Sequence, residues 1–137
     1  GAARALAHVH GRRLIHRDIK TSNILVNTDF SCKLADFGFV REVGENMTVC
    51  GTDEYMAPEL LFDEPFDTAA DIFSFGVVLL ETILRTKIGH DKDLIIRKPQ
   101  TCFKINFDEV FGGPEMPKDA PPPLVELTKE CLSYEPG

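Results

Sequence analysis

The sequence predicts a mainly α-helical fold with a small antiparallel β element, and three observations support this prediction. Residues 68–85 carry so many apolar side chains that almost no polar face remains, which indicates a buried central helix. Residues 122–132 place leucines at helical spacing behind a proline-rich entry, which predicts a second helix. Three apolar runs are too short for helices and predict strands: Leu14–Ile15, Ile24–Val26 and residues 32–35.

The shorter elements follow from local signals. Residues 2–10 contain no helix breaker and are followed by Gly11, which is typical of a helix that ends at a glycine. Turn-forming residues at 27–29 predict a hairpin between the second and third apolar runs. Asp67 or Thr68 is expected to cap the central helix, because a short polar side chain satisfies free backbone N–H groups there.

Two segments lack a periodic pattern. Residues 36–59 are punctuated by glycines and are predicted to form a long loop, and loops of this length inside compact domains are usually functional. Residues 86–120 mix proline, glycine and charged residues, so we expect them to be mostly irregular.

Composition excludes several classes of protein. The chain has 137 residues, 15 Lys plus Arg and 22 Asp plus Glu, which gives a net charge of −7 and argues against nucleic acid or an anionic membrane as the main partner. Its longest apolar run, residues 77–80, is far too short for a membrane span. The N-terminus lacks the apolar run of a signal peptide, so we expect a cytoplasmic protein. The oligomeric state is not readable from the sequence.

Cysteine and histidine spacing points away from metal and disulfide chemistry. The four cysteines, at 32, 50, 102 and 131, form no CxxC pair and are expected to be free thiols. His8, His10 and His90 have no partner at ligand spacing, so no metal role is expected for them.

The chemistry-bearing residues form three groups. Asp18 and Asn23 lie five residues apart in a polar loop between two predicted strands, where a carboxylate can accept a proton and an amide oxygen can bind a hard cation. Lys20 adds positive charge on the same loop, which suits a reaction that moves an anion such as phosphate. Asp36, directly after a strand, supplies a second oxygen ligand, and residues 57–59 close the long loop.

These groups resemble the eukaryotic protein kinases. The kinase pattern H-R-D-L-x-x-x-N is met at residues 16–23 with Ile19 in place of Leu, and D-F-G at 36–38 and A-P-E at 57–59 follow in order. The resemblance covers residues 1–137 and implies one kinase-like C-terminal lobe, with a catalytic loop at 16–23 and an activation segment at 36–59.

The resemblance implies a catalytic role for several residues. Asp18 would be the catalytic base that orients the substrate hydroxyl, and Lys20 would stabilise the transferring phosphoryl group. Thr52 would brace both of them through its hydroxyl. Asn23 and Asp36 would hold the Mg²⁺ ions that bridge the phosphates of ATP.

Other residues would support the site. Leu25 would lie under the adenine of ATP, while His16 and Phe37 would stack in the spine that reports the active state. Asp71, inside the apolar helix, would accept hydrogen bonds from the backbone at residues 16–17, because an unpaired buried charge is very costly.

Specificity and regulation are also implied. Lys20 and Gly51–Thr52 resemble serine/threonine kinases, while residues 72–76 resemble the tyrosine-kinase-like group, near the LIM kinases, some members of which have dual specificity. Thr48 lies where the family often carries an activating phosphate, which would pair with Arg17 and Arg41; the alternative is an unmodified loop threonine.

Comparison with the kinase pattern also identifies N-lobe features that the 137 residues do not contain. The Gly-rich loop, the strand lysine and its helix glutamate of the N-lobe are absent, so the ATP site would be complete only with an N-lobe. The family arginine that pairs with the Glu59 position would lie beyond Gly137, so Glu59 is expected to lack its partner. Two readings stay open: the C-lobe of an active Ser/Thr kinase that phosphorylates proteins, inactive in isolation, or a non-catalytic docking or scaffold module.

Overall fold

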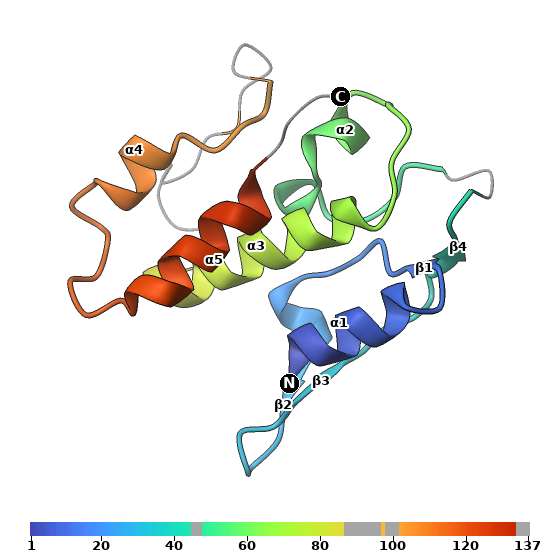
Figure 1. The fold of residues 1–137 in the computed structure, drawn as a ribbon, viewed down its shortest axis with the longest axis horizontal. Coiled ribbons are helices and arrows are strands. Elements are labelled where there is room, and N and C mark those ends of the chain that lie inside the picture. Colours follow the sequence, from blue (N-terminus) through green and yellow to red (C-terminus); the bar gives the residue numbers. More distant parts are fainter. Residues whose placement is uncertain (45–47, 87–96, 98–101, 134–137) are drawn as a thin grey trace.

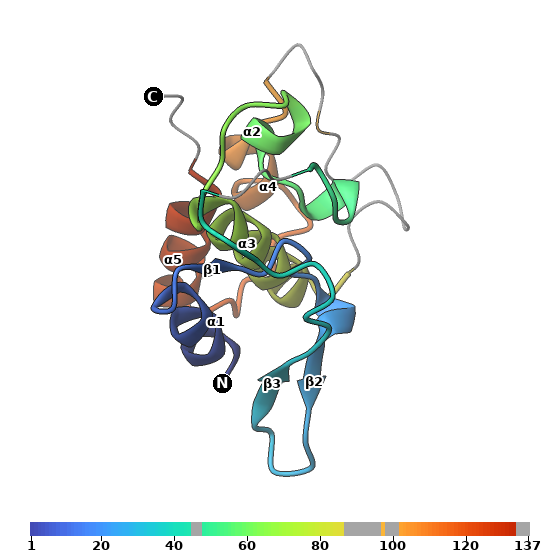
Figure 2. The ribbon, with the colours of Figure 1, turned by 90° about the vertical axis from the view of Figure 1, so that its right-hand side faces the viewer.

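Helix α3 (Ala69–Leu84) lies at the centre of the molecule, and the other elements pack around it (Figure 1). We describe a computed structural model in which residues 1–44, 48–86, 97 and 102–133 are placed. Helix α5 lies along one side of α3, while α1 and the catalytic loop lie on the other side (Figures 1 and 2).

The N-terminal part builds the scaffold of the catalytic loop. Helix α1 (Ala2–His10) ends at Gly11, whose amide donates to Ala7, and strand β1 (Leu14–Ile15) follows. The 3-10 turn η1 (Thr21–Asn23) leads into the hairpin of β2 (Ile24–Val26) and β3 (Cys32–Leu34), with Leu25 opposite Lys33. The hairpin extends away from the helices (Figure 2). Its open end, where β2 begins, directly follows η1.

The segment 36–59 contains more regular structure than the sequence predicted. Strand β4 (Arg41–Glu42) pairs antiparallel with β1, and the 3-10 turn η2 (Asp53–Tyr55) and helix α2 (Pro58–Leu61) follow. A two-residue strand is too short to carry a periodic signal, and it forms because the backbone groups of β1 need a partner. Residues 45–47 lie outside the described residues.

Helix α3 forms because its apolar residues pack on both sides. It is one residue shorter at each end than the range predicted from the sequence, and Asp67 accepts a hydrogen bond from the Ala69 amide at 2.7 Å, which caps its first turn. Gly76 lets α5 approach closely, because a Cβ atom there would lie 2.8 Å from Cys131 Cβ and 2.9 Å from Leu132.

The C-terminal part contains a helix that the sequence analysis missed. Helix α4 (Phe107–Phe111) lies within the segment predicted to be mostly irregular, and the Asn106 side chain caps it by accepting a hydrogen bond from the Glu109 amide. Helix α5 (Pro122–Leu132) spans the predicted range. Residues 87–96, which include His90, and residues 98–101 and 134–137 lie outside the described residues.

Two apolar clusters flank α3. The larger joins α3 to α2, α4 and α5. The smaller joins Leu6 of α1, Ile19 of the catalytic loop and Val78 of α3. The loop of residues 16–23 therefore packs between α1 and α3. Cys32, Cys50, Cys102 and Cys131 are all free thiols. No helix in the placed part of the chain combines the length and apolar character needed to cross a membrane.

Candidate active site

Asp18 is the centre of a network of polar side chains. Its carboxylate is only 5% exposed. It accepts hydrogen bonds from the Thr52 hydroxyl at 3.3 Å and the Asn23 amide at 3.1 Å, and the Lys20 ammonium lies 3.4 Å away. Lys20 also donates to Thr52 Oγ1 at 3.1 Å, so the activation segment and the catalytic loop share one network. This arrangement fixes the direction of the buried carboxylate.

Gly51 allows the activation segment to come this close. Its φ is +121°, a conformation that side chains rarely adopt, and a Cβ atom there would lie 2.7 Å from the carbonyl oxygen of Arg17. Any larger residue would push Thr52 away from Asp18.

Asp71 anchors the catalytic loop to α3. Its carboxylate is 1% exposed and accepts hydrogen bonds from the backbone amides of His16 at 2.8 Å and Arg17 at 2.9 Å. The Nε2 atom of His10, at the end of α1, forms a third contact at 2.9 Å. The sequence analysis predicted the two backbone contacts. It did not predict the contact between His10 and Asp71, because these residues lie 61 positions apart in the sequence.

The residue before Asp36 is tied to the same loop. The Ala35 amide donates to the Asn23 carbonyl at 2.9 Å, and the Ala35 carbonyl lies 3.0 Å from Nε2 of His16. The Asp18 amide donates to Nδ1 of His16, so the imidazole is assigned the tautomer with hydrogen on Nε2. These bonds hold the backbone directly before Asp36 beside Asn23 and His16.

Asn23 and Asp36 have the chemistry of a magnesium site. The amide nitrogen of Asn23 points to Asp18, which leaves its oxygen as a ligand, and Asp36 is an exposed carboxylate with φ +60°. Hard oxygen donors of this kind suit Mg²⁺, which in phosphate-transfer sites takes one or two protein ligands and fills the rest with phosphate and water. The placed residues contain no group of three His, Cys, Asp or Glu side chains able to hold a metal by themselves.

The surface beside this site exposes apolar side chains. Phe37 packs edge-on against His16, with ring centroids 5.2 Å apart, yet remains 53% exposed. Leu25 is also 53% exposed, and Val26 and Phe30 on the same hairpin are exposed as well. Leu25 and Val26 are consecutive in β2, so their side chains lie on opposite faces of the hairpin.

Tyr55 connects Thr21, in the loop of residues 16–23, to Glu81 on α3. Its hydroxyl donates to Glu81 at 2.7 Å and pairs with the Thr21 hydroxyl at 3.0 Å. Burial raises the pKa of Tyr55 to about 12, and the neighbouring Glu81 carboxylate acts in the same direction. No role for Tyr55 was expected from the sequence.

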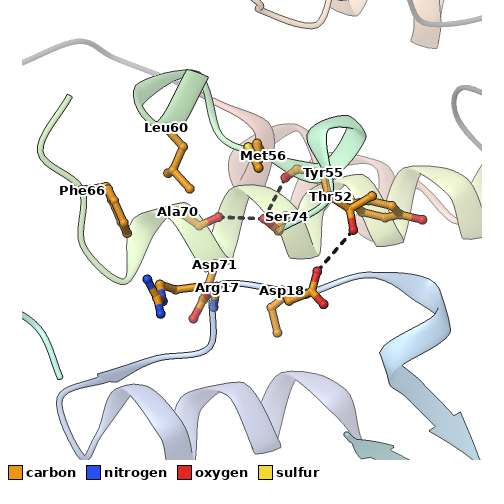
Figure 3. Close-up of a pocket in the computed structure, with 11 residues that line it drawn as sticks. Arg17, Asp18, Thr52, Tyr55, Met56, Leu60, Phe66, Ala70, Asp71 and Ser74 are labelled. Carbon is orange, nitrogen blue, oxygen red and sulfur yellow. Dashed lines mark hydrogen bonds between the residues drawn. The ribbon is translucent and has the colours of Figure 1, made fainter. Parts of the chain in front are cut away.

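A small pocket opens next to Asp18 and Thr52 (Figure 3). Its apolar side is formed by Met56, Leu60 and Phe66, and α3 forms its floor. The pocket is small, about 10 Å³, and places apolar side chains next to the buried carboxylate of Asp18.

Arg17 and Thr48 are in contact through the Thr48 backbone. The guanidinium of Arg17 donates to the Thr48 carbonyl at 3.0 Å and to the Phe39 carbonyl at 2.6 Å. Arg41 is exposed and donates to the Val40 carbonyl at 2.7 Å. Within the described residues, no hydrogen bond or ion pair joins Arg41 to Thr48.

Glu59 forms no ion pair among the described residues, and its buried Oε2 has no hydrogen-bond partner there. Arg97 and Glu59 interact electrostatically: Arg97 lowers the pKa of Glu59, and Glu59 raises the pKa of Arg97. Burial outweighs this attraction, so the pKa of Glu59 is raised overall and that of Arg97 is lowered to about 10. The sequence contained no local signal that paired these two residues.

Comparison with known proteins agrees with this geometry. A family model described as "Protein kinase domain" matches residues 2–137. The RasGEF domain-containing serine/threonine-protein kinase X of Dictyostelium discoideum is 41% identical over 139 residues, which cover 98% of this chain and 14% of that protein. The protein named probable serine/threonine-protein kinase kinY, from the same organism, is 40% identical and covers 98% of this chain and 24% of its own length. Another Dictyostelium discoideum protein, also named a probable serine/threonine-protein kinase, is 36% identical, and the chain spans 31% of its length. From the match over residues 2–137, the chain belongs to the protein kinase domain family.

Proposed function

We propose that this chain is the C-terminal lobe of a serine/threonine protein kinase, which transfers the γ-phosphate of ATP to hydroxyl groups of protein substrates. The observation that carries the proposal is the buried Asp18 carboxylate, held by Lys20, Thr52 and Asn23 beside an apolar pocket.

Asp18 orients the substrate hydroxyl and accepts its proton. A carboxylate is a weak base, so orientation is its larger contribution. Thr52 and Asn23 hold the carboxylate in place from two directions. Lys20, at 3.4 Å from Asp18, brings positive charge to the place where phosphoryl charge develops.

Asn23 and Asp36 would hold Mg²⁺ with ATP, and the metal would neutralise phosphate charge when bound. Leu25 would contact the adenine from below. The exposure of Leu25 and Phe37, 53% each, supports the further proposal that an N-lobe with a Gly-rich loop covers these side chains and completes the ATP site.

Sequence features support a finer assignment. Lys20 and Thr52 favour serine and threonine as acceptors, and residues 72–76 favour the tyrosine-kinase-like group near the LIM kinases, with dual specificity as the alternative. A cytoplasmic location is proposed from the free thiols.

We also propose that phosphorylation of Thr48 activates the enzyme. Arg17 already contacts the Thr48 backbone, and a phosphate there would add about −1.5 to −2 charges within reach of its guanidinium. Thr48→Ala in the active enzyme should lower activity, whereas Thr28→Ala, an exposed turn threonine on the hairpin, should not. Full activity of Thr48→Ala would refute the regulatory role.

A docking or scaffold module without catalysis is the second candidate.

Phosphotransfer distinguishes the two candidates. The 137-residue chain alone should be inactive, while a form that includes a Gly-rich lobe should phosphorylate a general protein substrate with Mg-ATP. Asp18→Asn should lower that rate by about 10²–10⁴-fold. Asp29→Asn, in the exposed hairpin turn, is the matched control and should not change the rate. Equal rates for Asp18→Asn and the unaltered protein would refute catalysis by this site.

A further inference from the structure

Helix α1 carries a row of basic side chains on its outer face. Arg4, His8 and, in the turn after the helix, Arg12 recur every four residues and are all exposed. Leu6 and Val9, on the opposite side, are buried, and Leu6 packs in a cluster with α3. Since α1 lies at the edge of the molecule (Figures 1 and 2), the row of Arg4, His8 and Arg12, here called the α1 stripe, faces away from α3.

Contacts within the stripe hold its far end in place. Nη1 of Arg12 lies 2.9 Å from Nδ1 of His8 and 3.5 Å from the His8 carbonyl oxygen, so the guanidinium folds back along the helix. The exposed Arg13 follows, and its carbonyl accepts a hydrogen bond from the Val43 amide at 2.8 Å. The backbone therefore keeps two neighbouring arginines together at one end of the stripe.

The charge of the stripe has no counter-charge beside it in the sequence. Residues 1–17 contain four arginines and no Asp or Glu, although the whole chain has a net charge of −7. In the part of the chain that the structure describes, none of the ion pairs includes Arg4, Arg12 or Arg13. Like charges that are held together repel one another, so binding of an anionic group among them is favourable.

The repeat of the stripe matches that of an extended polypeptide. Residues four apart on a helix are separated by about 6 Å along its axis, because the rise is about 1.5 Å per residue. Side chains two apart in an extended segment lie about 6.6 Å apart and point to the same side. Carboxylates at alternate positions of such a segment therefore fit the stripe, and arginine can bind a carboxylate through two parallel hydrogen bonds.

We propose that the α1 stripe, together with Arg13, docks an extended acidic peptide segment of a partner protein. The net charge of −7 favours this narrow partner over a membrane or a nucleic acid, because a broad anionic surface would also meet the acidic remainder of the chain. Docking at this face does not depend on phosphotransfer, because the stripe points away from the side of α1 that packs with Ile19.

Fluorescence anisotropy with the 137-residue chain tests the docking. The probe is a fluorescein-labelled peptide of five Glu-Gly repeats, and the same peptide with Gln in place of Glu is the neutral control. We expect the acidic peptide to bind about tenfold more tightly at about 50 mM NaCl and to lose most of this advantage at about 1 M, because salt screens exposed charges.

Substitution of the arginines locates the binding surface. Arg4→Gln combined with Arg12→Gln should weaken binding of the acidic peptide by about tenfold, since each exposed ion pair changes affinity by up to about fivefold. Arg85→Gln is the matched control, because Arg85 is 68% exposed but lies at the end of α3 beside Asp119, and it should change affinity by less than about twofold. If the double variant does not fold, Arg4→Gln alone carries the same test with a smaller change.

Several results would overturn the proposal. Equal affinity for the acidic and neutral peptides, or unchanged binding by the arginine variants, would show that the stripe does not recognise carboxylates. Tighter binding to phosphatidylserine vesicles or to a single-stranded oligonucleotide than to the acidic peptide would assign the stripe to a membrane or a nucleic acid instead. An enzyme form that includes a Gly-rich lobe and binds the acidic peptide without phosphotransfer would reject the kinase function but support the docking.

Discussion

Replacement of Asp71 by asparagine tests how the catalytic loop is held. The carboxylate accepts from the His16 amide on one oxygen and from the Arg17 amide on the other, at 2.8 and 2.9 Å, and it is 1% exposed. An asparagine offers one oxygen and one NH₂ group, so one buried N–H must face another donor. The His10 contact, at 2.9 Å, loses its charged partner as well.

The expected loss of stability follows from these contacts. A buried N–H left without an acceptor costs about 1–3 kcal/mol, and conversion of the remaining charged hydrogen bond to a neutral one costs about 1 kcal/mol more. We therefore expect Asp71→Asn to lower the free energy of unfolding by about 2–4 kcal/mol.

Urea unfolding followed by circular dichroism measures this change. With a denaturant slope of about 2 kcal/mol/M, the unfolding midpoint should fall by about 1–2 M. Asp119→Asn is the control, because Asp119 is 70% exposed in its pair with Arg85 and should change stability by less than about 1 kcal/mol. A loss below about 0.5 kcal/mol for Asp71→Asn would show that this carboxylate does not hold the loop.

Three further predictions follow from packing, strain and titration. Gly76→Ala should cost about 1–3 kcal/mol, because its Cβ would lie within 2.9 Å of the Leu132 side chain, and urea unfolding measures this cost. Gly51→Ala should reduce phosphotransfer more than it reduces stability, because its Cβ would meet the Arg17 carbonyl at 2.7 Å beside the site; equal effects in both assays would contradict this. Tyr55 keeps its proton in the fold up to about pH 12 but loses it near pH 10 when unfolded, so the free energy of unfolding should fall as the pH rises from 10 to 12. In Tyr55→Phe that decline should be weaker, and ultraviolet titration should lose the phenol that ionises near 12.

Some elements missed by the sequence analysis did have a local signal. Helix α4 begins at Asn106, whose side chain caps the Glu109 amide, and Asn followed three residues later by Glu is a recognised start of a helix. The signal was hidden in a segment rich in proline and glycine.

Other contacts had no local signal. The pairing of β1 with β4, the contact of His10 with Asp71, and the hydrogen bond from Arg97 to the Met56 carbonyl each join residues far apart in the sequence. Their partners are chosen by the packing of α1, α3 and the activation segment around one another.

The sequence alone determined what depends on neighbouring residues: the apolar pattern of α3 and α5, the turn of the hairpin, and the order and spacing of Asp18, Asn23 and Asp36. Backbone geometry translates such patterns directly into helices, turns and loops. Only the tertiary structure decided which distant groups satisfy the buried charges, because several candidate partners share the same chemistry. Burial makes an unpaired charge costly, and the fold determines which partner is within reach.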